Sequence, residues 1–217
     1  MKQLFTKNTL HWILGLLIST LGICFSTKSD FGLSMIAAAP YILHVKLSEF
    51  LPWFSQGTAE YVWEGLILIA MCLVIRRFRP RYLLSFGTAI LAGWLIDLWF
   101  LPLGGNGAYG TLAARILSFL AGMVITSFGV AFFFRTSLPL EVYELAVTEV
   151  AEKFQWSTNK VKYGFDLLMF ALALLLSFLL TGSLTGIGIG TVCMTLLNAW
   201  IIAFFGKLID RVEGKQA

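Results

Sequence analysis

Three carboxylates lie within stretches of sequence that are otherwise apolar. Asp97 stands inside "GWLIDLWF", and Glu64 and Asp166 each lie about one turn inside another apolar segment. An ionised carboxylate in the core of a bilayer costs several kcal/mol unless it is paired, protonated or reached by water. Because burial favours the neutral form, such groups are suited to carrying a proton. We therefore predict that Asp97, Glu64 and Asp166 couple transport to protons or ions, although a salt bridge between Asp97 and Arg115 would satisfy the same charge without transport.

A second set of polar residues follows two apolar segments. Lys28 comes directly after the first of them, in "STKSDFGLS" (26–34), and Arg135 follows "GMVITSFGVAFFF". Each cation precedes a segment that could form a short helix, and the N-terminus of such a helix adds positive electrostatic potential. Snorkelling to the membrane interface explains each cation alone, and a contact between helices explains a polar residue inside a span. As a pair, the cations predict a site for an organic anion, with these substrate-binding residues: Lys28, Asp30, Ser34, Arg135, Glu141 and Asn198.

The composition is that of an integral membrane protein. Of the 217 residues, 58% are hydrophobic and only 13% are charged, well away from the average for soluble domains. The net charge of +4 is modest, so nucleic-acid binding has no support. The three cysteines and two histidines form no metal-ligand or catalytic pattern. We expect no metal, no cofactor and no enzymatic activity.

Six segments are long and apolar enough to cross a bilayer, for which about 20 residues are needed. The first has no small-residue cleavage site before the polar residues that follow it, so we interpret it as a retained helix rather than a signal peptide. The expected partners are the lipid bilayer and a small-molecule solute. The predicted spans are 9–26, 60–76, 83–103, 111–134, 161–181 and 186–206.

The distribution of basic residues predicts the orientation of these spans. With the N-terminus in the cytoplasm, the arginine-rich turn at 76–81 and the connection at 135–160 are also cytoplasmic, whereas the outer turns 104–110 and 181–186 carry no charge. Both termini are therefore predicted to be cytoplasmic. The alternative makes 31–47 a seventh span and reverses every later segment.

Two further segments are helical in pattern but do not fit a span. Residues 31–43 are apolar yet too short to cross, and residues 138–154 contain four glutamates. We predict that both form half-helices, either re-entrant or lying in the membrane interface.

The two halves of the chain resemble each other. Residues 15–33 align without a gap on residues 122–140, an offset of 122 minus 15, or 107 positions. The alignment places Lys28 on Arg135, and later Gly87 and Thr88 correspond to Gly190 and Thr191, an offset of 103. Because each half holds three spans, the second half would enter the membrane from the opposite side. We predict an all-α membrane fold with a 3+3 inverted repeat, 1–107 and 108–217, forming one membrane domain.

The same motifs resemble those of the bacterial YczE/YitT-like membrane proteins, whose first half carries Lys-x-Asp-x-Gly-x-Ser and a Gly-Thr segment ending in Ile-Asp. The resemblance covers most of the chain and implies a multi-pass protein of the bacterial cytoplasmic membrane, but it supplies no agreed substrate and no catalytic residues. The second half departs from the pattern at Ser137, Pro139 and Glu141. The residues that carry the resemblance are Lys28, Asp30, Gly32, Ser34, Gly87, Thr88, Ile96 and Asp97.

These observations favour a small-molecule transporter that works by alternating access between the two repeats. Its expected substrate is an organic anion or another carboxylate-bearing solute. One alternative is a substrate-binding membrane subunit that needs an energising partner. The other is a membrane scaffold or regulator in which the charges form structural pairs. A homodimer is compatible with each of the three.

Overall fold

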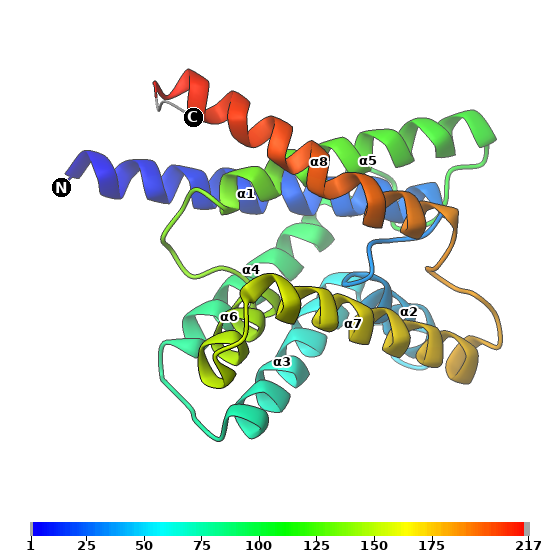
Figure 1. Cartoon of the computed structure of the whole chain (residues 1–217). Helices are drawn as coiled ribbons and strands as arrows, with labels where there is room; N and C mark the ends of the chain where they lie inside the picture. Colours follow the sequence, from blue (N-terminus) through cyan, green and yellow to red (C-terminus); the bar gives the residue numbers. More distant parts are fainter. Residues whose placement is uncertain (1, 215–217) are drawn as a thin grey trace. The chain divides into compact units, whose positions relative to one another are not determined.

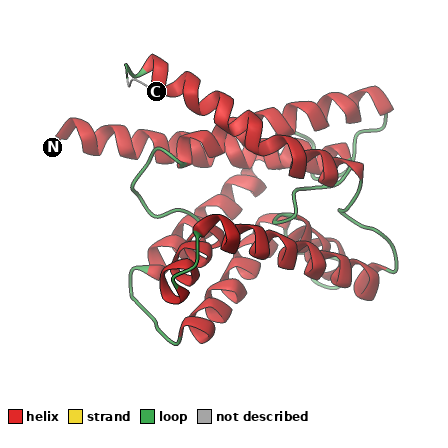
Figure 2. Ribbon diagram, in the orientation of Figure 1, coloured by secondary structure: helices red, strands yellow, loops and turns green. Residues whose placement is uncertain are grey.

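The computed structural model describes residues 2–214, and every regular element within that range is a helix (Figure 2). The described chain forms helices of two lengths, long ones of 19 residues or more and two short ones (Figure 1). In chain order they are α1 (Lys2–Ser29), α2 (Ala38–Leu47), α3 (Gln56–Ile75), α4 (Tyr82–Phe100), α5 (Leu112–Phe133), α6 (Val142–Phe154), α7 (Thr158–Thr181) and α8 (Ile189–Val212).

The six long helices confirm the six predicted spans. Among the described residues, α1 from Lys7 onward, α3, α4, α5, α7 and α8 are each long and apolar enough to cross a membrane. Their ends lie within a few residues of the predicted limits, except that α8 extends six residues beyond the predicted end at 206. The chain is therefore a multi-pass membrane protein. Its many exposed leucines and phenylalanines are the surface expected against lipid.

The two short helices do not reach across a bilayer. Helix α2 has 10 residues and α6 has 13, which at 1.5 Å per residue gives about 15 and 20 Å against a hydrocarbon core of about 30 Å. The alternative of a seventh full span at 31–47 therefore does not form. Helix α2 begins at Ala38, later than predicted, because the backbone turns at Asp30 and Gly32, which have φ values of 55° and 106°.

Local side chains set the ends of several helices. Ser55, Thr111 and Ser157 are the N-caps of α3, α5 and α7, and each hydroxyl oxygen accepts a backbone N–H from the first turn. At the other ends, α3 and α7 stop at Arg76 and Gly182, both in the left-handed region. These signals lie in the turns that separate the apolar runs.

The helices group into two compact units. The first contains α1, α5, α8 and the end of α4 from Leu98. The second contains α2, α3, α4 as far as Asp97, α6 and α7. Each unit takes helices from both halves of the chain, so the sequence division at 107/108 is not the border of a compact body.

In the first unit, α1 and α5 run antiparallel at close range, side by side in Figure 1 (blue and green). A Cβ atom added to any of four glycines on this seam would come within 3.0 Å of the opposite helix. In successive close pairs the residue number increases along α1 and decreases by the same amount along α5, which defines the antiparallel register. The closest pairs are Gly15 with Phe133, Ser19 with Gly129, Gly22 with Thr126 and Ser26 with Gly122.

These close pairs are reciprocal under the sequence alignment of the two halves. At the 107-residue offset Gly22 aligns with Gly129, and its partner Thr126 aligns with Ser19. The close pair of Gly22 with Thr126 therefore corresponds to the close pair of Gly129 with Ser19. Gly15 with Phe133 converts in the same way into Gly122 with Ser26. Any antiparallel pair in this register converts into another in this way, so the specific match is that glycine falls on glycine, Gly15 on Gly122 and Gly22 on Gly129.

The second unit is built around its two short helices. Helix α2 packs on α3 and α7, and α6 packs on the same two helices. Side chains of α3, α4, α6 and α7 share one apolar core, because α6 presents a buried face toward the other three helices. The fully or mostly buried members of that core are Ile67, Leu68, Met71, Ile75, Tyr82, Ala89, Val142, Tyr143, Ala146 and Met169.

Candidate functional site

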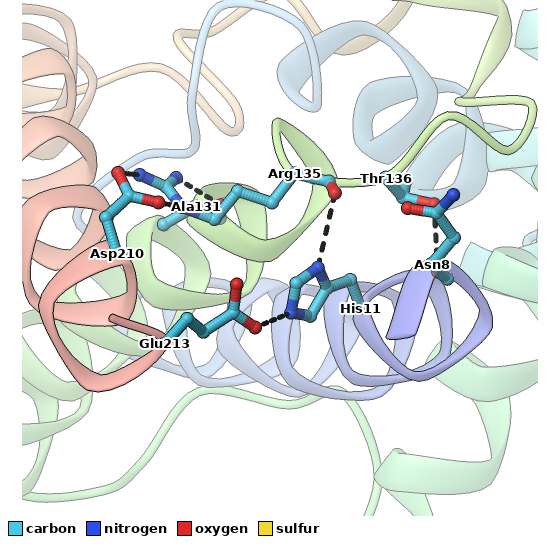
Figure 3. Close-up of polar contacts among 7 residues, drawn as sticks. All are labelled: Asn8, His11, Ala131, Arg135, Thr136, Asp210 and Glu213. Atoms are coloured by element: carbon cyan, nitrogen blue, oxygen red, sulfur yellow. Dashed lines mark hydrogen bonds and ion pairs between the residues drawn. The ribbon is translucent and has the colours of Figure 1, made fainter. Parts of the chain in front are cut away.

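Arg135 is held by an acidic partner of its own unit. Its guanidinium group forms two hydrogen bonds with the Asp210 carboxylate, Nε to Oδ1 at 2.8 Å and Nη2 to Oδ2 at 2.5 Å (Figure 3). The remaining nitrogen, Nη1, donates to the Ala131 carbonyl at 2.8 Å. A bidentate arginine–carboxylate pair is strong and directional. Arg135 therefore fastens the C-terminal end of α5 to α8.

His11 of α1 adds a link to the ends of these two helices. Its Nδ1 lies 3.2 Å from the Arg135 carbonyl oxygen, and its Nε2 lies 2.7 Å from Glu213 Oε1 (Figure 3). Nearby, the Thr136 hydroxyl donates to the Asn8 carbonyl at 2.9 Å. The ends of α1, α5 and α8 are thus joined by side chains that are far apart in sequence.

Lys28 is also bound by the protein itself. Its ammonium group donates to the carbonyl oxygens of Gly105 and Gly107, each at 2.9 Å, and lies 4.6 Å from the centre of the Tyr109 ring. The side chain is almost fully buried, with 4% of its surface exposed. These contacts anchor the turn that follows α4.

We expect Lys28→Met to loosen that turn. The variant keeps the aliphatic stem but removes two charged hydrogen bonds, each contributing about 1.5 to 3 kcal/mol. Amide hydrogens of residues 104–110 should then exchange at least about tenfold faster, since 1.4 kcal/mol is a factor of ten. Hydrogen-exchange mass spectrometry of the protein in nanodiscs measures this. Lys46→Met, which removes an exposed pair with Glu49, is the matched control, and equal exchange in both variants would contradict the anchoring role.

The structure does not bring Lys28 and Arg135 together. In the register that pairs Ser26 with Gly122, Lys28 lies level with about residue 120 of α5. Arg135 is roughly 15 residues further along, or about 22 Å. The predicted anion site shared by the two cations is therefore not formed, because antiparallel packing places them at opposite ends of the α1/α5 pair.

The partners of the two cations nevertheless come from corresponding positions in the sequence. At the 103-residue offset between α4 and α8, Asp210 of the second half corresponds to Gly107 of the first half. Gly107 is one of the two hydrogen-bond partners of Lys28. Each cation thus contacts the region where the last helix of its own half ends. In the first half α4 has already stopped at Phe100 and carbonyls are the acceptors, whereas in the second half α8 continues and a carboxylate is the acceptor.

The other predicted substrate residues of this unit are distributed along it. Asp30 pairs with Arg115 at 2.9 Å, and Arg115 also donates to the Ser29 carbonyl at 2.8 Å. Asn198 Oδ1 accepts the Ser127 hydroxyl at 3.3 Å, which is a contact between α8 and α5. Ser34 is half-buried in the segment before α2. These contacts are structural links rather than one convergent site.

In the second unit, Asp97 caps a helix. Its Oδ1 accepts the Gly57 N–H at 2.9 Å, and its Oδ2 accepts the Ser55 hydroxyl at 2.5 Å. A carboxylate at a helix N-terminus is stabilised by the free N–H groups and the helix dipole. The charge of Asp97 is therefore satisfied at the start of α3, and the partner of Arg115 is Asp30 rather than the Asp97 that the alternative interpretation named.

Glu64 differs from the other two predicted coupling carboxylates. Its side chain has no exposed surface, its Oε2 accepts the Val142 N–H of α6 at 2.7 Å, and its Oε1 has no hydrogen-bond partner. One turn away on α3, Glu60 is 5% exposed and accepts the Tyr143 hydroxyl at 3.1 Å. Two carboxyls of α3 therefore meet the first turn of the short helix α6, and we call Glu60, Glu64, Val142 and Tyr143 the acidic cluster.

Glu141 lies beside this cluster, and Asp166 has a partner of its own. Glu141 is the residue before the first turn of α6, and burial together with the carboxyls of Glu144 and Glu60 raises its pKa well above the usual range. Asp166 pairs with Lys162 at 2.5 Å, one turn away on α7. Of the predicted residues, the structure thus brings together Glu64 and Glu141.

A buried clamp holds the other end of α6. Glu149, with 6% of its side chain exposed, accepts the Tyr82 hydroxyl at 2.6 Å and pairs with Arg81 and Arg79 of the arginine-rich turn. Burial alone would raise the pKa of Glu149, but the hydrogen bonds from Tyr82 and Arg81 outweigh burial and lower it. The turn between α3 and α4 is therefore fixed to α6.

The two Gly-Thr motifs meet the segments that precede the short helices. In the first unit, the Gly190 N–H donates to the Phe31 carbonyl at 2.8 Å, and Gly32 lies against Thr191. In the second unit, the Thr88 hydroxyl donates to the Pro139 carbonyl at 3.0 Å. Gly32 corresponds to Pro139 and Thr191 to Thr88, so these two contacts are also reciprocal.

Sequence reasoning missed several of these residues. Glu60 could have been found, because it lies four positions before Glu64 and therefore on the same helix face. Tyr143 and Glu149 carry no signal beyond the helical pattern of their segment. His11 and Glu213 are 202 positions apart, and nothing local connects them.

Comparisons with known proteins match nearly the whole chain but assign no activity to it. A family described as a family of unknown function (DUF6198) matches residues 6–207. The chain is similar to the "Uncharacterized protein YyaS" of Bacillus subtilis (strain 168), with 26% identity over 207 residues that cover 93% of this chain and 94% of that protein. No solved structure matches. The YczE/YitT-like resemblance is not confirmed by these comparisons.

Proposed function

We propose that the chain, which belongs to the DUF6198 family of unknown function, is a solute transporter that works by alternating access between two inverted repeats. The observation that carries the proposal is the reciprocity of contacts between the halves. On the α1/α5 seam the 107-residue offset places glycine on glycine, Gly15 on Gly122 and Gly22 on Gly129. The contact of Gly32 with Thr191 likewise corresponds to that of Pro139 with Thr88. A scaffold has no need for such symmetry.

Reciprocal contacts give a two-state carrier a simple mechanism. If the halves are structurally equivalent, each can adopt the conformation of the other, and the exchange opens the pathway first to one side of the membrane and then to the other. The interrupted spans of such proteins supply the polar groups near the middle of the membrane. In this proposal the short helices α2 and α6 take that role, and α6 meets the acidic cluster.

We assign the coupling role to Glu64. Asp97 is occupied at the N-terminus of α3 and Asp166 by Lys162, whereas one oxygen of the fully buried Glu64 has no partner. A buried carboxyl that must be neutralised is suited to binding and releasing a proton. Lys28 and Arg135 bind oxygens of the protein itself. The proposal therefore rests on the repeat and on Glu64 rather than on an anion site.

The setting follows from the same reasoning. We place the protein in the bacterial cytoplasmic membrane with both termini in the cytoplasm, because this orientation puts the arginine-rich turn at 76–81 inside. No catalytic chemistry is part of the proposal. An energising subunit or a second copy of the chain would be a partner in the same membrane.

The test uses the purified protein in liposomes that contain a pH-sensitive dye. A panel of organic anions, organic cations and neutral solutes is added outside, and internal pH is recorded for the parent, Glu64→Gln and Glu152→Gln. Glu152 is exposed on α6 and serves as the control. We expect at least one solute to change internal pH with the parent and the control, and Glu64→Gln to abolish that change while keeping the Val142 N–H paired.

Other outcomes separate the alternatives. A solute that raises the melting temperature of the parent without moving protons or entering vesicles would indicate a substrate-binding subunit, since binding to the native state stabilises it. If no solute stabilises the protein or changes internal pH, the transporter proposal is wrong and the scaffold interpretation replaces it.

A further inference from the structure

The backbone of residues 31–32 packs tightly against the Gly190-Thr191 motif of the second half. Gly190 donates its N–H to the Phe31 carbonyl, and a Cβ atom at Gly190 would come within 3.0 Å of that oxygen and of the Phe119 ring. A Cβ atom at Gly32 would likewise come within 3.0 Å of Thr191 and of Gly188. The Phe31 carbonyl can approach the first turn of α8 this closely because Gly190 has no side chain. We call this approach the Gly190 contact.

The equivalent place in the first half is open. Thr88 reaches the Pro139 carbonyl with its hydroxyl, but a Cβ atom at Gly87 would meet nothing within 4 Å. The helices differ too, because α8 begins at Ile189, one residue before its Gly-Thr motif, whereas α4 begins at Tyr82, five residues before. The two halves thus have the same motif in two conformations.

We propose that the Gly87 and Gly190 motifs are the two alternating gates of the protein, closed at Gly190 and open at Gly87 in this structure. In the other state the backbone that precedes α6 closes on Gly87, and the Gly190 contact opens. Because Pro139 cannot adopt the positive φ of Gly32, this approach uses the space at Gly87 and does not copy the turn at Gly32. This inference rests on the proposed inverted repeat and names the contacts that its two states exchange.

The two-state proposal explains why position 87 holds a glycine. In the observed state an alanine there would contact nothing, and glycine within a helix is less stable than alanine. A close backbone approach in the second state gives the missing reason, because a Cβ atom would block it as it would at Gly190. The two motifs then need glycine for the same contact at different times.

Gly87→Ala is the test, because a static structure predicts that it does nothing harmful. If the gates alternate, the variant cannot close at position 87 and remains in the observed state. Hydrogen exchange of the parent and the variant in nanodiscs, without added solute, is compared for peptides covering 29–35 and 187–193. We expect exchange of the Gly190 amide to slow by severalfold in Gly87→Ala. Gly164→Ala, another open glycine in a long helix, should exchange as the parent does.

Gly190→Ala provides the opposite arm. Its Cβ clashes with the closed contact, so exchange in both peptides should become faster while the protein stays helical by circular dichroism. The proposal is overturned if Gly87→Ala exchanges at the rate of the parent, or if Gly164→Ala slows exchange equally. Failure here with solute-driven proton movement intact would reject these gates alone, whereas slowed exchange without any transported solute would keep the two states and reject the carrier.

Discussion

Alanine at Gly22 and at Gly129 is expected to destabilise the protein by about 2 kcal/mol or more, and by similar amounts at the two positions. Overpacking a tight interface costs about 1 to 3 kcal/mol, and here the added Cβ meets backbone atoms, which cannot rotate away. The Gly22 Cβ would meet Thr126, and the Gly129 Cβ would meet Ser19. Because these two contacts are reciprocal, the two losses should match.

Unfolding by a denaturing detergent in mixed micelles measures both losses. Gly164→Ala is the matched control, since its Cβ meets nothing within 4 Å and alanine is the better helix former. The control should leave the free energy of unfolding unchanged or raise it. A large loss at Gly22 with none at Gly129 would show that the seam is not symmetric, and would remove the main support for the repeat.

Replacing Glu149 by leucine should cost about 1 to 3 kcal/mol. Tyr82 is fully buried, and its hydroxyl would lose its acceptor, which is the expensive way to break a hydrogen bond. Leucine fills most of the space, so the loss reports on the polar contacts rather than on a cavity. The same unfolding assay measures it, with Glu152→Leu as the exposed control on α6.

The clamp also predicts how stability depends on pH. The pKa of Glu149 is lower in the folded chain than in the unfolded chain, where a glutamate has a pKa of about 4.3. Its contribution is therefore complete at higher pH and is lost as pH falls through the folded-state value. Glu149→Gln keeps an acceptor for Tyr82 but cannot titrate, so its acid destabilisation should be weaker than that of the parent. Parallel acid curves for the two proteins would contradict the assigned charge.

The spans could be predicted from the sequence because each depends on a local property. Runs of about 20 apolar residues, separated by turns rich in glycine or arginine, are sufficient to place six helices within a few residues. The short helices could be predicted for a related reason, since 31–43 and 138–154 are too short or too acidic to span. The end of α8 and the start of α2 were misplaced, and α2 begins late because the turn at Asp30 and Gly32 depends on backbone conformation.

The candidate site could be predicted only in part, because charges inside a membrane choose partners across the fold. Glu64 stood out as an isolated carboxylate, but its neighbour Tyr143 is 79 positions away and reaches the cluster only through the packing of α6 on α3. Lys28 and Arg135 align with each other in the sequence, yet the alignment says nothing about distance. Antiparallel packing of α1 and α5 separates them, and the acceptors Gly107 and Asp210 occupy their charges.

The mixing of both halves in each compact unit has a consequence for biogenesis. Helix α1 leaves the ribosome first, but the helix that fits its row of glycines and hydroxyls is α5, more than 80 residues later. Until then, Ser19 and Ser26 face lipid or a helper protein rather than their final neighbours on α5. Insertion can proceed span by span, but folding of the first unit waits for the second half of the chain to be made.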